Sequence, residues 1–100
     1  MFKTTTLITS SGLTFLTVNE FKDELEKYYD SYNYKLGVDN FEVKEKIINR
    51  EETLTDGNTL TTITIWDNEA SYIEFYKNSV DDINALETAG YIRTVTTENI

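Results

Sequence analysis

The chain contains no cysteine and no histidine. The lack of cysteine excludes disulfide bonds, thiolate metal sites and a cysteine nucleophile. The lack of histidine removes the commonest general base and the commonest protein ligand for zinc and haem iron. No run of about 18 apolar residues is present, so we expect no membrane-spanning helix. Enzymes that need a cysteine nucleophile, a histidine base or a zinc or haem site held by these residues are therefore poor matches to this sequence.

Basic residues are also scarce, because nine Lys and Arg stand against 18 Asp and Glu and give a net charge of −9. This charge is a poor match for a phosphate backbone, so we expect no nucleic-acid binding. Acidity alone is common, because charge keeps soluble domains dispersed. A sharper alternative is an acidic viral inhibitor whose carboxylates mimic a nucleic acid. Such a mimic needs carboxylates along one face, whereas here lysines are interleaved with them.

Residues 1–100 are predicted to form a single domain, since this length supports one hydrophobic core and no repeat or linker divides it. The chain is rich in Lys, Asn, Ile, Tyr and Phe, which resembles the products of AT-rich bacterial or viral genomes. Ser and Thr interrupt the apolar run near the N-terminus, and no cleavage site follows it. We therefore expect a cytoplasmic protein, located in the host cytoplasm if the source is a virus.

The first half of the chain predicts a strand and a helix. A β-branched run over residues 2–9 is typical of a strand. Thr17 and Glu20 fit the capping-box pattern that begins a helix. Apolar residues then recur at three- and four-residue steps, which predicts one helix over residues 18–36.

A hairpin follows, with arms at residues 41–55 and 58–66. Asp56 and the glycine after it are typical of a two-residue turn. Such a turn would place Arg50 opposite Ile63.

The apolar positions of the first arm change phase within residues 41–48, which indicates either a bulge or a helical segment there. Beyond the hairpin, Asn68 or the aspartate before it would cap a helix, and Ser79 would begin a second short helix. A β-branched run over residues 91–97 predicts a last strand. The expected order is strand, helix, hairpin, helix pair, strand. This is the β-α-β-β-α-β arrangement of a ferredoxin-like α+β domain, an antiparallel sheet with helices on one face.

The segment over residues 64–77, TIWDNEASYIEFYK, adds a more specific signal. It resembles the strand-to-helix junction of the dimeric α+β barrel superfamily, the group that contains antibiotic-biosynthesis-monooxygenase-like domains. That resemblance implies a homodimer in which two sheets pack face to face. On this view Trp66, Leu60 and Ile47 would lie on the sheet face away from the helices and pack against the partner.

The chemistry of that family is matched only in part. Its haem-degrading members use a histidine, which this chain lacks. Its cofactor-free monooxygenase members are similar at Trp66 but carry an asparagine where this chain has Thr62. We therefore expect no cofactor and no metal, and the acidic residues lack the alternating spacing of a calcium loop.

Two groups of residues are candidate sites. Aromatic and polar side chains could line a cavity, with an arginine as a fixed cation for an anionic ligand. The alternative is that the tryptophan is core or dimer interface and the arginine is a cross-strand partner of neighbouring acids. A tyrosine-rich helix end could form a protein-contact patch or pack as core and rim. The cavity candidates are Trp66, Arg50, Thr64 and Tyr72, and the patch candidates are Tyr28, Tyr32 and Tyr34.

The main functional prediction is a small acidic, non-catalytic binding protein that acts as a homodimer. Its ligand would be a protein partner or a small apolar molecule. The alternative is a cofactor-independent monooxygenase- or isomerase-like enzyme acting on a small aromatic molecule. In that case Tyr72 or Arg50 would polarise an oxygen atom while Trp66 shapes the pocket.

Overall fold

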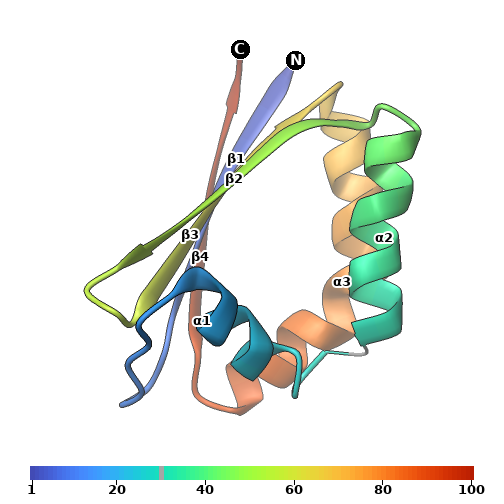
Figure 1. Ribbon diagram of the computed structural model, residues 1–100. Helices are drawn as coiled ribbons and strands as arrows, with labels where there is room; N and C mark the ends of the chain where they lie inside the picture. The colour runs from blue at the N-terminus through green and yellow to red at the C-terminus, as the bar shows by residue number, and fades with distance from the viewer. Residues whose placement is uncertain (30) are drawn as a thin grey trace.

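The computed structural model describes residues 1–29 and 31–100, with the side chains of residues 31–36 left out of the description. Over this part of the chain the elements follow the order β1, α1, α2, β2, β3, α3, β4. Figure 1 shows the sheet as one layer, with the helices against a single face of it. The predicted ferredoxin-like α+β fold is confirmed.

The sheet is antiparallel, with strand order β2-β3-β1-β4 in the described residues. Its central strands are β1 (Phe2–Thr9) and β3 (Thr59–Trp66), and its edges are β2 (Ile47–Thr55) and β4 (Ile92–Asn99). Threonine, isoleucine and valine dominate these segments, and β-branched side chains favour extended backbone.

The hairpin turn has three residues, because Thr55 pairs with Thr59. The two-residue prediction is therefore wrong. Asp56 and Gly57 both have positive φ, 54° and 73°, which suits a longer loop with glycine in the left-handed region. The extra residue moves the register by one and places Arg50 opposite Thr64 instead of Ile63.

A β-bulge lies at Ile48, where the register shifts between Ile47 and Asn49. The predicted phase change is thus a bulge, and the exposed Ile48 is its extra residue. Helical structure covers residues 41–43 as well, since α2 extends to Val43. The arm predicted to begin at residue 41 therefore begins at Ile47.

Two helices replace the single helix predicted over residues 18–36. The first, α1 (Val18–Leu25), begins where predicted, with the Glu20 amide donating to Thr17 Oγ1 at 3.1 Å. It ends in a tightened turn, in which the amides of Lys27 and Tyr28 bond to carbonyls three residues back. The second helix is α2 (Ser31–Val43).

One helix, α3 (Glu69–Thr88), replaces the predicted helix pair. Asn68 caps it by accepting from the Ser71 amide at 3.0 Å. Ser79 lies buried inside this helix and does not start a new one. No proline or glycine interrupts residues 69–88, so helical hydrogen bonding continues past Ser79. Among the described helices, none is long and apolar enough to cross a membrane.

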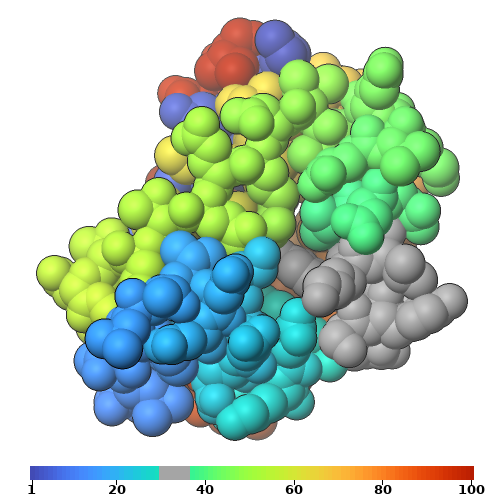
Figure 2. All heavy atoms as spheres, viewed as in Figure 1, coloured from blue at the N-terminus to red at the C-terminus, as the bar shows by residue number. Residues whose placement is uncertain are grey.

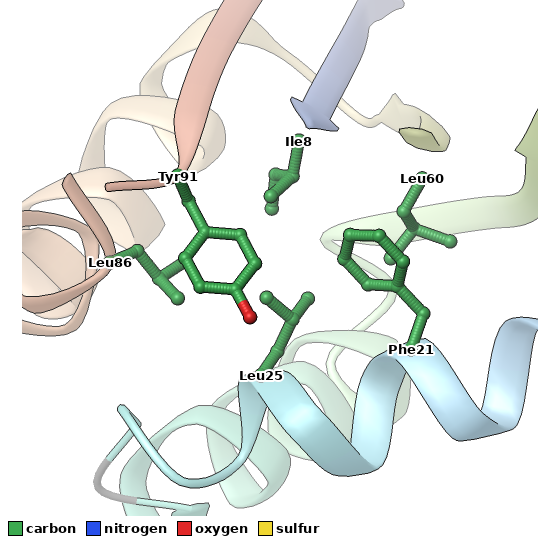
Figure 3. Close-up of a cluster of buried hydrophobic side chains, with 6 residues drawn as sticks. All are labelled: Ile8, Phe21, Leu25, Leu60, Leu86 and Tyr91. Atoms are coloured by element: carbon green, nitrogen blue, oxygen red, sulfur yellow. The ribbon is translucent and has the colours of Figure 1, made fainter. Parts of the chain in front are cut away.

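The core consists of two apolar clusters between the sheet and the helices. One lies against α1 and contains Tyr91 beside residues of β1, β3 and α3 (Figure 3). The other packs against α2 and α3 and contains Trp66. The first cluster comprises Ile8, Phe21, Leu25, Leu60, Leu86 and Tyr91. The second comprises Phe2, Val38, Phe41, Ile47 and Trp66.

The prediction that Trp66, Leu60 and Ile47 face a partner sheet is wrong. Their exposed fractions are 3%, 3% and 4%, and all lie on the helix-covered face. Strand pairing explains this, because Phe2 is opposite Trp66 and Ile8 is opposite Leu60, and paired residues share a face. The opposite face therefore belongs to the alternate residues of each strand.

Candidate functional site

A polar strip separates the two apolar clusters on the inner face of the sheet. Thr4 pairs with Thr64, and Thr6 pairs with Thr62, so four threonines form a block on the central strands. Thr4 and Thr64 are buried. Hydroxyl groups in this position can donate and accept hydrogen bonds inside the fold. The sheet thus presents a polar floor beneath α3.

A cavity of about 70 Å³ lies on this floor. All four cavity candidates of the sequence, Trp66, Arg50, Thr64 and Tyr72, line it. Register explains the grouping, because Arg50 pairs with Thr64 and therefore shares its face. The helix α3 supplies the opposite wall. On its own, a cavity of this size accommodates only water-sized groups, so an aromatic molecule would also have to occupy adjoining space.

A larger cavity of about 300 Å³ lies between α1, α2 and the sheet. It reaches the lower end of the size range of small-molecule sites. The two cavities share Ile8, Tyr29, Arg50 and Thr62 in their walls. We therefore treat them as one candidate site, with a small inner part and a larger outer part. Figure 2 shows the side on which β2 lies at the surface between α1 and the green end of α2.

A charged network holds Arg50 in place, and sequence analysis predicted only a pairing of Arg50 with neighbouring acids. Its guanidinium lies 3.5 Å from Glu52 Oε1, and the same oxygen lies 3.0 Å from Lys22 Nζ of α1. The side chains of Arg50 and Glu52 are largely buried, which limits screening by water. The alternation of β2 could have revealed the inward placement of this pair, because Arg50, Glu52 and the apolar Leu54 share one face.

Two further charged groups line the smaller cavity. Arg93 of β4 lies with its guanidinium carbon 5.9 Å from the centre of the Tyr76 ring, a cation–π contact. Asp82 of α3 faces the same cavity. The inner part of the site therefore combines two guanidinium groups with one carboxylate.

Trp66 belongs both to the core and to the cavity wall. Its Nε1 donates a hydrogen bond to Thr4 Oγ1 at 3.0 Å. Its ring packs edge-on to Tyr72, with 5.5 Å between the ring centres, and against Phe75 at 5.4 Å. Aromatic pairs at such distances and tilts stabilise each other beyond the area they bury. The wall around Trp66 is thus rigid and aromatic.

The tyrosine patch remains a prediction. Tyr28 is half-buried and packs edge-on against Tyr91, with 5.5 Å between ring centres. The side chains of Tyr32 and Tyr34 lie outside the described residues. In the described part of the chain no group of three acidic residues could hold a metal ion.

Comparison with known proteins gives matches in structure only. No protein-family model and no curated protein sequence matches this chain. A crystal structure of a putative antibiotic biosynthesis monooxygenase from Deinococcus radiodurans is similar to it, with TM-score 0.67 and 12% identity, covering 100% of this chain and 92% of that one. SnoaB, a cofactor-independent oxygenase from Streptomyces nogalater solved as an asparagine-to-alanine mutant, has TM-score 0.65 and 11% identity over 99% and 91% of the two chains.

A third similar structure bears on assembly. It is a dimeric ferredoxin-like protein from an uncultured marine organism, with TM-score 0.50 and 11% identity, covering 97% of this chain and 89% of that chain. The three likenesses confirm the resemblance to the dimeric α+β barrel superfamily at the level of the fold. The homodimer stays a prediction for this chain. Its cytoplasmic location and viral source remain predictions.

The main functional prediction, a non-catalytic binding protein, is wrong. The structures that match this chain over almost its full length are named mainly as antibiotic biosynthesis monooxygenases or a cofactor-independent oxygenase. They favour the enzyme alternative over the non-catalytic one. Fold likeness does not by itself transfer an activity, so the case for catalysis depends on the site.

Proposed function

We propose that the protein is a cofactor-independent, oxygenase-like enzyme that acts on a small aromatic molecule. The observation that carries this proposal is the pair of adjoining cavities. Together they combine aromatic walls, a threonine floor and the ion-paired Arg50. Apolar walls with a few directed polar groups are typical of small-molecule sites.

The proposed reaction requires the protein to bind the substrate, remove a proton and stabilise negative charge. When no cofactor takes part, the electrons that reduce dioxygen must come from the substrate. An aromatic carbon acid that loses a proton becomes an electron-rich anion. Dioxygen then converts its ring CH₂ group to a carbonyl, and the second oxygen atom leaves as water. The enzyme therefore has to remove a proton and stabilise the resulting oxyanion.

The residues of the site suit these two tasks. Arg50 is a permanent cation and would stabilise an oxyanion on the ring. Tyr72 would polarise the same oxygen with its hydroxyl. Asp82 is the candidate proton acceptor of the smaller cavity, because the chain has no histidine to take that role. Thr62 lines both cavities at the position of the family's asparagine and would offer a hydroxyl in place of an amide.

The proposed enzyme is a homodimer that packs through the open face of the sheet. This face carries Leu7, Ile63 and Ile65, which are half-buried in the single chain, and Ile92, which is 66% exposed. An uncovered sheet face of this kind gains stability when a second sheet covers it. The dimeric ferredoxin-like structure that resembles this chain supports the same assembly.

Oxygen uptake tests the proposed activity. We would supply 1,8-dihydroxyanthrone, a three-ring carbon acid, and record dioxygen consumption above the buffer blank. Wild-type protein should accelerate uptake, and Arg50→Gln should lower the enzymatic rate about 10²-fold, as the loss of one oxyanion-stabilising group does. Lys77→Gln removes the same charge from an exposed position on α3 and is the matched control.

Three results would contradict or redirect this proposal. Uptake equal to the blank for a panel of aromatic carbon acids would contradict an oxygenase. Exchange of the substrate's ring proton without oxygen uptake would identify an isomerase-like enzyme instead. Equal rates for wild type and Arg50→Gln would remove the arginine from the mechanism.

A further inference from the structure

The hydrogen bond between Trp66 and Thr4 is buried inside the candidate site. Its two partners have exposed fractions of 3% and 2%, and the distance from Nε1 to Oγ1 is 3.0 Å. Both residues line the smaller cavity. A buried indole N–H without an acceptor is unfavourable, so this bond restricts the orientations open to the ring.

The sheet register explains how the two side chains meet. Trp66 is directly opposite Phe2 on the neighbouring strand, and Thr4 is the next residue of that strand on the same face. Diagonal neighbours across antiparallel strands lie within reach of a long aromatic side chain. The indole therefore lies along the sheet, toward the threonine floor. Tyr72 and Phe75 of α3 pack against its ring.

We propose that Thr4 is a positioning residue, whose hydroxyl fixes the Trp66 ring as the wall of the ligand cavity. The inference rests on the proposed function of that cavity. Because the indole N–H is already bonded to Thr4, Trp66 meets a ligand with its ring and not as a hydrogen-bond donor. The polar contacts of the ligand then fall to the other polar side chains of the site, which include Arg50, Tyr72 and Asp82.

The single tryptophan of the chain makes this proposal testable by fluorescence. Thr4→Val keeps the shape of the side chain but removes the acceptor, and Thr4→Ser keeps the hydroxyl. We expect Thr4→Val to change the emission maximum of Trp66, while Thr4→Ser retains the wild-type emission. Thr6→Val is the matched control for emission. It removes a hydroxyl from the same strand and face without touching the indole bond.

Binding of 1,8-dihydroxyanthraquinone, followed by quenching of Trp66, provides the functional readout. Thr4→Val should bind it about tenfold more weakly than wild type, and Thr4→Ser should restore binding. Wild-type emission and wild-type affinity in Thr4→Val would overturn the positioning role. So would equal losses in the valine and serine variants, because they would indicate a packing effect only.

Failure of the proposed function would look different. If wild type bound no aromatic probe, the ligand cavity itself would be disproved. An unchanged emission in Thr4→Val would then also overturn the hydrogen-bond role, whereas a changed emission rescued by Thr4→Ser would retain it.

If Thr4→Val failed to fold, normal folding and binding in Thr4→Ser would support the hydroxyl as the required group. Loss of folding in Thr4→Ser as well would overturn its specific role.

Discussion

Replacement of Tyr91 by phenylalanine should make the protein more stable. Tyr91 is 6% exposed and lies in the cluster formed with Phe21 and Leu25. Figure 3 shows its hydroxyl pointing toward Leu25, and among the described residues this oxygen has no hydrogen-bond partner. The hydroxyl therefore lost its hydrogen bonds to water when the chain folded and gained none from the described residues in return.

The magnitude follows from the groups that change. A buried polar group without a partner costs about 1–3 kcal/mol, and phenylalanine removes that cost while keeping the ring. The edge contacts of the ring with Tyr28 and Phe21, at 5.5 Å and 6.3 Å between centres, remain. We expect a gain of about 1 kcal/mol or more in the free energy of unfolding. For a domain of this size, 1 kcal/mol corresponds to a rise of about 4–8 °C in Tm.

Urea and thermal unfolding, followed by circular dichroism at one fixed protein concentration, would measure this gain. The concentration has to be fixed because dimerisation shifts the apparent stability. Tyr76→Phe is the control, since Tyr76 is exposed and its substitution should change stability by less than about 0.5 kcal/mol. A loss of stability in Tyr91→Phe would refute the reasoning and show that the hydroxyl is hydrogen-bonded.

Two further predictions concern alkaline pH and assembly. Burial first, and then the neighbouring Tyr28 and Glu24, raise the pKa of the Tyr91 hydroxyl, so the unfolded chain loses this proton at lower pH than the folded chain. Stability should therefore fall as the pH rises above about 10, and urea titrations of Tyr91→Phe should show a shallower fall. Ile63→Glu places a charge on the open sheet face and should convert a dimer of twice 11.6 kDa to a monomer in light scattering. A wild-type mass of 11.6 kDa at all concentrations would contradict the dimer.

Much of the fold could be predicted from local sequence, but not the lengths of its helices. The caps at Thr17 and Asn68 lie where their side chains predicted helix starts. The apolar spacing over residues 18–36 did not reveal the division into α1 and α2. Phe21 and Leu25 of α1 are buried, and so are Val38 and Phe41 of α2, so buried apolar residues occur in both helices. Ser79 led to the opposite error, because a helix start was predicted there and the helix is continuous. A serine also fits inside a helix, and Ser79 lines the smaller cavity.

The candidate site was predicted by its residue types more than by its geometry. The length of the hairpin turn decides which face Arg50 occupies, because a three-residue turn pairs Arg50 with Thr64 and a two-residue turn would pair it with Ile63. The Asp56-Gly57 pair fits either length. The inward placement of Glu52 and Arg93 was not predicted, because a charged residue within a strand is ordinarily assigned to the solvent side. For Arg93 this placement follows from the pairing of β4 with the distant β1, whereas for Glu52 the alternation with Leu54 could have indicated it.

The origin of the oxygen atom in the product is the most direct test of the proposed oxygenase. Purified protein in chelator-treated buffer, with no flavin or haem added, would be given 1,8-dihydroxyanthrone and isotopically labelled dioxygen. We expect the quinone product to contain one labelled oxygen atom and the released water to contain the other, at a rate above the blank that falls in Arg50→Gln. Turnover no faster than the blank, or a product oxygen derived from water, would contradict the proposed reaction.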